Sequence, residues 1–238
     1  MRLHRFIGKY DLSKTEIEIL DAKIIRQIKD VLRLKKGEKI ILSDGQDQEA
    51  EVSLNLISAN KITGTVNEVK KTANDKSFVR ARKVNLYLAI LKKENFELAV
   101  QKTVEAGVHR IIPIITERTI KTGLNFPRLE KIMIEASEQS GRNVTSVLSP
   151  IFSFKEALLD GANNQEKIIF HPTGIIYAPS TNKNAESISI FIGPEGGFTE
   201  NEIREAKKAG YTVASLGSLI LRGETAAIIA TYRTAKGI

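Results

Sequence analysis

Two different rhythms of hydrophobic and polar residues divide the chain. Residues 24–32 carry apolar side chains at helical spacing, and 40–42 form a short apolar run. Residues 48–57 and 61–69 then alternate between apolar and polar positions, as the two strands of a pair do. The chain up to residue 72 is therefore predicted to be a small β-rich unit that contains one helix.

Residues 72–77 are polar and lack periodicity, so we place a boundary there and predict two domains, 1–72 and 73–238. Beyond the boundary, apolar runs at 84–91, 110–116, 168–170, 189–192 and 211–216 alternate with helical patterns at 96–104, 129–140, 199–210 and 224–232. Thr199 and Glu202 have the spacing of a capping box. Alternating strands and helices predict an α/β fold whose mostly parallel sheet is covered on both faces.

Two glycine-containing loops in the second domain each follow an apolar run and open a helix. The first is 193–199, Gly-Pro-Glu-Gly-Gly-Phe-Thr, and the second is 217–223, Gly-Ser-Leu-Ile-Leu-Arg-Gly. Both are expected at the carboxyl ends of parallel strands, where ligands bind. Neither loop matches a common nucleotide-binding motif, so a phosphate cradle is disfavoured. A tight strand-to-helix turn is the alternative interpretation of the first loop.

The charge distribution favours a polyanionic partner. The formal net charge is +8 and the isoelectric point is near 9.5. Basic residues gather in the first ten positions and again in 61–93, which holds nine Lys or Arg against two acidic residues. A solvated lysine-rich surface is the alternative, but two basic segments flanking one domain favour nucleic acid.

The composition also excludes several chemistries. There is no Cys, which rules out disulfides and thiolate metal sites, and His4, His109 and His171 lack metal-ligand spacing, so no metal site is expected. No G-x-S-x-G elbow is present, which disfavours covalent catalysis. Since no apolar run suits a signal peptide or a bilayer span, we expect a soluble cytoplasmic protein with no membrane partner.

Four charged residues are candidates for a reactive site. Glu138 and Arg142 lie off the apolar face of the helix predicted at 129–140, although their i, i+4 spacing is also that of an ordinary exposed pair. Arg222 stands in the second glycine loop, where a cation is well placed to hold an anion. Glu224 opens the last helix, a position where the helix dipole favours an acid in any case.

The two loops together carry a family resemblance. Residues 192–198, 215–217 and 220–226 resemble the small-subunit ribosomal RNA uridine-N3 methyltransferase family (RsmE), a member of the trefoil-knotted SPOUT methyltransferases. The similarity runs along the whole chain. Segments 31–37 and 44–45 resemble the PUA-like RNA-binding domain of that family, and 101–108, 116–118 and 135–142 resemble its catalytic domain.

The resemblance implies a PUA-like barrel followed by a knotted SPOUT domain that forms a homodimer. The implied reaction is S-adenosylmethionine-dependent methylation of N3 of a uridine in the 16S rRNA of the small ribosomal subunit. The resemblance implies that the cofactor is bound by Ile192, Gly193, Gly197, Leu216, Gly217, Leu221 and Thr225. Backbone groups around residues 216, 217 and 221 are expected to hold its adenine. Those expected to bind RNA are Arg2, Arg5, Lys9, Arg33, Arg80 and Arg82.

For the reaction, Glu138 is the first candidate to accept the N3 proton and Glu224 the second, while Arg142 and Arg222 stabilise an anion or clamp a phosphate. The chain departs from the family at Gly223, where we expect a side chain and therefore a looser loop, and at 92–95, where the family often has Pro-Lys-Gly. Two alternatives stay open. One is a SPOUT methyltransferase with another RNA target, and the other is a non-catalytic assembly factor that binds rRNA through the basic N-terminal unit.

Overall fold

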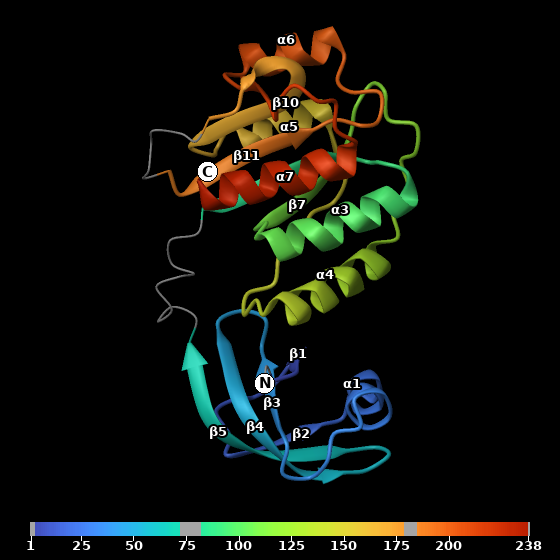
Figure 1. Cartoon of the computed structure of the whole chain (residues 1–238), viewed down its shortest axis with the longest axis vertical. Coiled ribbons are helices and arrows are strands. Elements are labelled where there is room, and N and C mark those ends of the chain that lie inside the picture. The colour runs from blue at the N-terminus through green and yellow to red at the C-terminus, as the bar shows by residue number, and fades with distance from the viewer. Residues whose placement is uncertain (1–2, 72–81, 179–184, 238) are drawn as a thin grey trace. The chain divides into compact units, whose positions relative to one another are not determined.

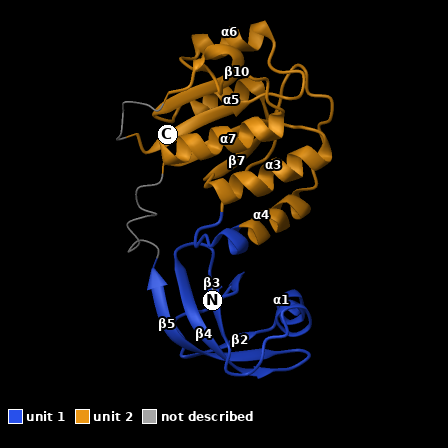
Figure 2. Ribbon diagram, viewed as in Figure 1, with its two compact units in different colours: residues 1–80, 137–145 blue, residues 81–136, 146–238 orange. Residues whose placement is uncertain are grey.

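The computed structural model describes residues 3–71, 82–178 and 185–237 (Figure 1). The chain divides into two compact units, residues 1–80 with 137–145 and residues 81–136 with 146–238 (Figure 2). The boundary predicted after residue 72 falls within 72–81 and lies outside the described residues. Nothing in the hydrophobic pattern predicts that the short segment 137–145 groups with the first unit.

A curled, mostly antiparallel sheet forms the first unit. Its strand order is β1-β3-β4-β5-β2, in which only β1 and β3 pair in parallel. The elements are β1 (Arg5–Ile7), β2 (Glu16–Ile19), the helix α1 (Ala22–Arg26), the π-helical turn η1 (Gln27–Val31), β3 (Lys39–Ser43), β4 (Gln48–Ile57) and β5 (Ile62–Lys71). The predicted strand pair is confirmed as β4 and β5, because Ala50, Val52 and Leu54 alternate into a common core.

A seven-stranded sheet organises the second unit. The strand order is β12-β10-β11-β6-β7-β8, with β9 also on β7, and every pair is parallel. The strands are β6 (Lys83–Ala89), β7 (Arg110–Ile115), β8 (Val147–Leu148), β9 (Phe152–Ser153), β10 (Glu166–Ile176), β11 (Ser187–Ile192) and β12 (Thr212–Ser215). The helices are α3 (Lys93–Ala106), α4 (Phe126–Ser140), α5 (Phe154–Gly161), α6 (Glu200–Lys208) and α7 (Gly223–Lys236). The predicted α/β fold is confirmed.

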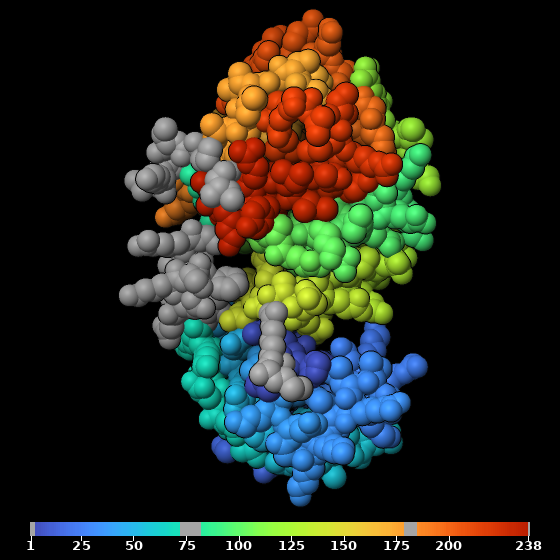
Figure 3. All heavy atoms as spheres, viewed as in Figure 1, coloured from blue at the N-terminus to red at the C-terminus, as the bar shows by residue number. Residues whose placement is uncertain are grey.

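Helices cover both faces of this sheet, as the alternation of residues along β6 requires. Leu86 and Leu88 belong to a buried cluster with α3, α4 and α7, whereas Tyr87 and Ala89 point into a second cluster with α5 and α6. In the space-filling view the red atoms of α7 lie on the surface of the unit (Figure 3). The capping box of Thr199 and Glu202 at the start of α6 is confirmed. Helix α5 was not predicted from the sequence, although Ser153 and Glu156 form a capping box at its start.

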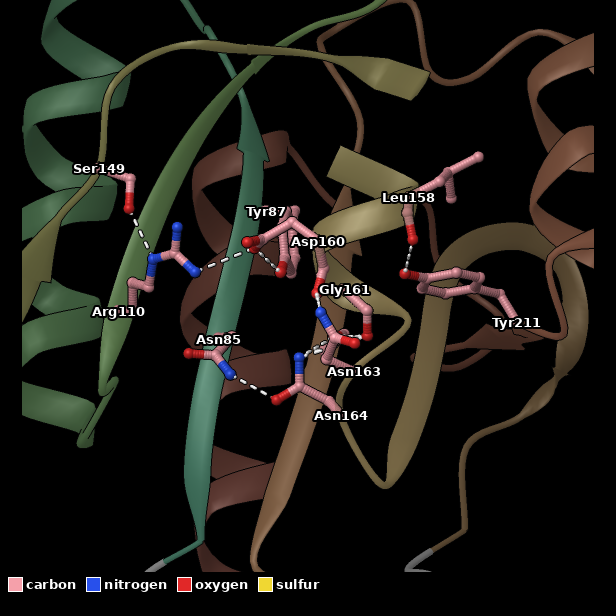
Figure 4. A network of polar contacts seen from close by, with 11 residues as sticks. Asn85, Tyr87, Arg110, Ser149, Leu158, Asp160, Gly161, Asn163, Asn164 and Tyr211 are labelled. Carbon is pink, nitrogen blue, oxygen red and sulfur yellow. Dashed lines mark hydrogen bonds and ion pairs between the residues drawn. The ribbon is translucent and has the colours of Figure 1, made fainter. Parts of the chain in front are cut away.

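A polar network ties α5 to the strands beneath it (Figure 4). One carboxylate oxygen of Asp160 accepts hydrogen bonds from Arg110 Nη1 at 2.9 Å and from the Tyr87 hydroxyl at 2.5 Å. Arg110 Nε also donates to the Ser149 hydroxyl at 2.6 Å. Burial and the bond to Asp160 raise the pKa of the Tyr87 hydroxyl, so Tyr87 stays a neutral donor. The network therefore fixes the end of α5 against β6 and β7.

The parallel arrangement brings distant loops to one edge of the sheet. The first glycine loop follows β11, the second follows β12, and the turn at 116–119 follows β7. Because all these strands are parallel, the segments that follow them emerge at the same carboxyl edge. This edge is where the candidate site lies. Over the described ranges, no helix has both the length and the apolar character to cross a membrane.

Candidate active site

A cavity of about 680 Å³ opens among the loops at the carboxyl edge of the parallel sheet. Its wall is made by residues 192–198 at the first glycine loop, 215–216 and 219–224 at the second, and 170–172 of β10. Lys92, Asn95, Arg118 and Ala226 complete it. The volume lies within the range of small-molecule sites, and most of the wall comes from chain segments rich in glycine.

The first glycine loop is held by bonds within itself and to a neighbouring loop. The backbone N–H of Gly197 donates to the Pro194 carbonyl at 2.8 Å, and Glu195 Oε1 accepts from the Lys92 N–H at 3.0 Å. Gly197 has a φ of +68°, a left-handed conformation that other residues adopt at a cost. Gly193 is needed for a different reason, since a Cβ there would lie 3.2 Å from the backbone nitrogen of Phe198.

The second glycine loop turns around one serine. Ser215 Oγ donates to the Gly217 carbonyl at 2.8 Å and accepts from the Gly217 N–H at 3.3 Å, while Gly217 has a φ of +142°. Gly223 does not fit the expectation of a loosened loop. A Cβ at this position would lie 2.8 Å from Leu91 Cδ2, so the glycine lets the start of α7 pack closely on the segment that follows β6.

Two side chains in the cavity wall, Arg118 and His171, are missing from the predicted site. Arg118 Nη1 donates to the Gly196 carbonyl at 2.7 Å and so braces the first loop. The Thr173 N–H donates to His171 Nδ1 at 3.3 Å, and the Thr173 hydroxyl lies 2.8 Å from the same nitrogen. Burial, and then the charge of Arg118, lower the pKa of His171. Its place between a buried strand and Pro172 was the available signal.

The predicted cofactor residues are only partly gathered in the cavity. Those that line it are Ile192, Gly193, Gly197, Leu216 and Leu221. Gly217 and Thr225 are not among the lining residues, although each is next to one that is. The cavity therefore unites the two loops that the glycine pattern singled out, and a cofactor-binding role for each residue stays a prediction.

The four predicted catalytic residues separate into two pairs. Arg222 and Glu224 line the cavity, at the N-cap and in the first turn of α7. Glu138 and Arg142 belong to the first unit, where Glu138 Oε1 accepts the Ile7 N–H at 2.8 Å and Arg142 Nε donates to the Val144 carbonyl at 3.3 Å. Burial lowers the pKa of the Arg142 guanidinium to about 10.

The residues predicted to bind RNA have different surroundings. Arg5 and Arg82 are largely buried and make ion pairs, Arg5 with Glu49 and Arg82 with Glu166. Lys9 and Arg33 are exposed, and Arg33 has an unusual φ of +53°. Arg2 and Arg80 lie outside the described residues. Among the described residues of this set, Lys9 and Arg33 are the exposed ones. In the described part of the chain, no group of three or more His, Asp or Glu side chains could hold a metal ion.

Comparison with known proteins identifies the family of the chain. Residues 79–234 match the model of the RNA methyltransferase domain family. Ribosomal RNA small subunit methyltransferase E from Rickettsia conorii is 33% identical over 232 residues, which cover 94% of this chain and 91% of that protein. The chain belongs to the ribosomal RNA small subunit methyltransferase E family within the RNA methyltransferases.

Two solved structures resemble the whole chain. Ribosomal RNA small subunit methyltransferase E from Neisseria gonorrhoeae, bound to S-adenosylmethionine, has a TM-score of 0.86 and 29% identity, covering 97% of this chain and 95% of that one. A structure from Legionella pneumophila with the same cofactor has a TM-score of 0.82 and 29% identity, covering 97% and 96%. Relatives of this fold thus bind S-adenosylmethionine.

Proposed function

We propose that the protein transfers a methyl group from S-adenosylmethionine to N3 of a uridine in the 16S rRNA of the small ribosomal subunit. The observation that carries this proposal is the cavity between the two glycine loops, in a chain whose relatives are named as small-subunit rRNA methyltransferases. The loops contain no Lys-Ser or Lys-Thr after their glycines, which suits a cofactor without phosphate groups.

The cavity wall offers what this cofactor needs. Backbone groups around Leu216, Gly217 and Leu221 would recognise adenine, and the loop from Ile192 to Gly197 would hold the rest of the molecule. When bound, S-adenosylmethionine supplies a methyl group already activated by its sulfonium. The task left to the protein is to align the uridine with that methyl group and to handle one proton.

The charged residues supply the proton and charge chemistry. Uridine N3–H is a weak acid at neutral pH, so its removal requires a base or a cation that stabilises the uridinate. Arg222, in the cavity wall, and Arg142 are assigned to the developing anion or to a backbone phosphate. Glu138 is the first candidate for the proton acceptor and Glu224 the second.

The resemblance to the family supports the remaining assignments. The first unit is assigned as the PUA-like RNA-binding domain, and the second as a knotted SPOUT domain that dimerises and works on cytoplasmic ribosomes. Leu219 and Ile220 are 79% and 87% exposed beside the cavity, which suits a site completed by a second copy or by RNA. Sedimentation velocity tests the dimer, since a monomer at micromolar concentration would contradict it.

Reverse transcription tests the reaction directly. An N3 methyl group blocks the Watson–Crick edge of the uridine. Incubation of the protein with S-adenosylmethionine and small subunits that lack this methyl group should therefore produce one new stop of reverse transcriptase. Arg222→Ala should abolish the stop, and Glu138→Gln should slow its appearance while RNA binding is kept. Methyl transfer to another position would support a different RNA target. Binding to rRNA without cofactor binding would support the assembly-factor alternative.

A further inference from the structure

Glu224 lies in the wall of the cavity with one carboxylate oxygen unsatisfied. The residue is only 6% exposed, in the first turn of α7. Its Oε2 has no hydrogen-bond partner among the described residues. A buried carboxylate oxygen without a donor is destabilising, so its retention in a cavity wall calls for an explanation.

A second buried glutamate shows how this fold satisfies such a group. Glu202, 5% exposed in the first turn of α6, accepts the Thr199 N–H at 2.8 Å and the Glu117 N–H at 2.9 Å. The N-cap of α7 is Arg222, which makes no side-chain capping bond. Both carboxylates are buried in the first turn of a helix, Glu202 at its third residue and Glu224 at its second. The protein supplies donors to Glu202, outside the cavity, and leaves one oxygen of Glu224, in the cavity wall, without any.

The backbone around Glu224 cannot move far to reach another donor. Gly223 packs so closely that a Cβ would lie 2.8 Å from Leu91 and 3.4 Å from the Gly193 carbonyl oxygen. On the following turn, Ala227 is completely buried. The first turn of α7 is thus held between the segment that follows β6 and the first glycine loop, so Oε2 meets a ligand in the cavity by rotation of the Glu224 side chain.

We propose that Glu224 is a cofactor-binding residue whose Oε2 accepts a hydrogen bond from an N–H or O–H group of S-adenosylmethionine. The cofactor has such donors at its ribose hydroxyls, at its adenine amino group and at its α-ammonium group. The inference rests on the proposed function and assigns Glu224 to ligand binding in place of proton transfer. It also explains why an unpaired carboxylate persists, because the ligand supplies the missing donor.

Calorimetry and thermal unfolding of the full chain test this assignment. Glu224→Gln keeps the shape and removes the charge, so affinity for S-adenosylmethionine should fall about tenfold, and Glu224→Ala should weaken it by roughly 100-fold. The melting temperature of Glu224→Gln without ligand should equal or exceed that of the wild type, because an unsatisfied buried charge has been removed. 5′-Methylthioadenosine, which lacks the amino-acid group, separates the ammonium from the other donors. An equal loss of its affinity assigns the nucleoside part of the cofactor, and no loss assigns the ammonium.

Glu200→Gln is the matched control, since Glu200 is an exposed acid in the first turn of α6 and outside the cavity. It should leave cofactor affinity unchanged. Wild-type affinity in Glu224→Gln would overturn the inference and leave the proposed function standing. A lower melting temperature of that variant without ligand would also overturn it, because the role would then be structural. A wild-type protein that binds the cofactor and leaves rRNA unmethylated would instead overturn the proposed function.

Discussion

Arg118 and Gly196 are fitted to each other across 78 residues of sequence. The Arg118 guanidinium donates to the Gly196 carbonyl oxygen at 2.7 Å, and a Cβ on Gly196 would lie 3.3 Å from Arg118 Cδ. The arginine therefore lies against the first glycine loop at a point where only the smallest residue leaves it room. This contact links the end of β7 to the loop that follows β11.

Loss of this brace should weaken cofactor binding. We expect Arg118→Met to reduce affinity for S-adenosylmethionine about fivefold, the equivalent of ~1 kcal/mol for one hydrogen bond. Isothermal titration calorimetry measures the change. Arg128→Met is the control. Arg128 forms an ion pair with Glu97 at 2.7 Å, and neither residue lines this cavity. Equal affinities in the Arg118 variant and the wild type would show that the loop needs no brace.

The left-handed glycines of the two loops should not tolerate a side chain. Gly197→Ala and Gly217→Ala should each cost about 1 kcal/mol of folding stability and weaken cofactor binding, because φ is +68° and +142°. Neither site has an atom within 4 Å of the new Cβ, so the effect isolates backbone strain. Gly123→Ala also meets open space, but without a left-handed φ, and should be neutral in thermal unfolding and calorimetry. Neutral behaviour at all three positions would refute the argument.

In the basic N-terminal segment, Lys9 should contribute to RNA binding and Arg5 to folding stability. Lys9 is exposed, so Lys9→Gln should lower the slope of log affinity for RNA against log salt by about 0.7 to 0.9 without changing stability. Arg5 bonds to Glu49 and, at 2.6 Å, to Asn143, so Arg5→Gln should mainly destabilise the protein. Filter binding across a salt series and urea denaturation separate the two effects. If Arg5→Gln lowered the slope of log affinity against log salt by more than Lys9→Gln does, the assignment would be reversed.

Asp160 is expected to be a stability residue. Asp160→Asn replaces a charged acceptor of two hydrogen bonds with a neutral amide, so unfolding free energy should fall by about 1 to 3 kcal/mol. Urea denaturation gives the value. Glu130→Gln, on the exposed side of α4, should change little. Cofactor affinity should survive in folded Asp160→Asn, since Asp160 does not line the cavity; loss of that affinity would connect the network to the site.

His171 should make stability sensitive to mild acid. Folding lowers its pKa from the ordinary value of 6.5, so the folded state binds fewer protons than the unfolded state. Its contribution is therefore fully present above pH 6.5 and is lost as the pH falls below that value. Thermal unfolding between pH 8 and 5 should show a steeper decline for the wild type than for His171→Gln. Parallel curves would exclude the effect.

Short-range patterns in the sequence predicted the local structure well. The capping box of Thr199 and Glu202, the strand pair at β4 and β5, and the alternation of strands with helices all depend on residues a few positions apart. The glycines of the two loops predicted turns, because a left-handed φ or a close backbone approach excludes side chains at those positions. These features follow from steric and hydrogen-bonding rules that act within one turn or strand.

The tertiary structure alone decided which side chains share a site. Arg118 belongs to a segment with a family resemblance and His171 follows a buried run, but neither signal places them together. They share the cavity because β7 and β10 run parallel to β11 and β12 in one sheet. In the same way, Glu138 is joined to the first unit by a hydrogen bond from Ile7, 131 residues away. Local periodicity sets the type of each element, but the order of strands is set by the packing of the whole core. The composition of the site therefore became visible only in the folded chain.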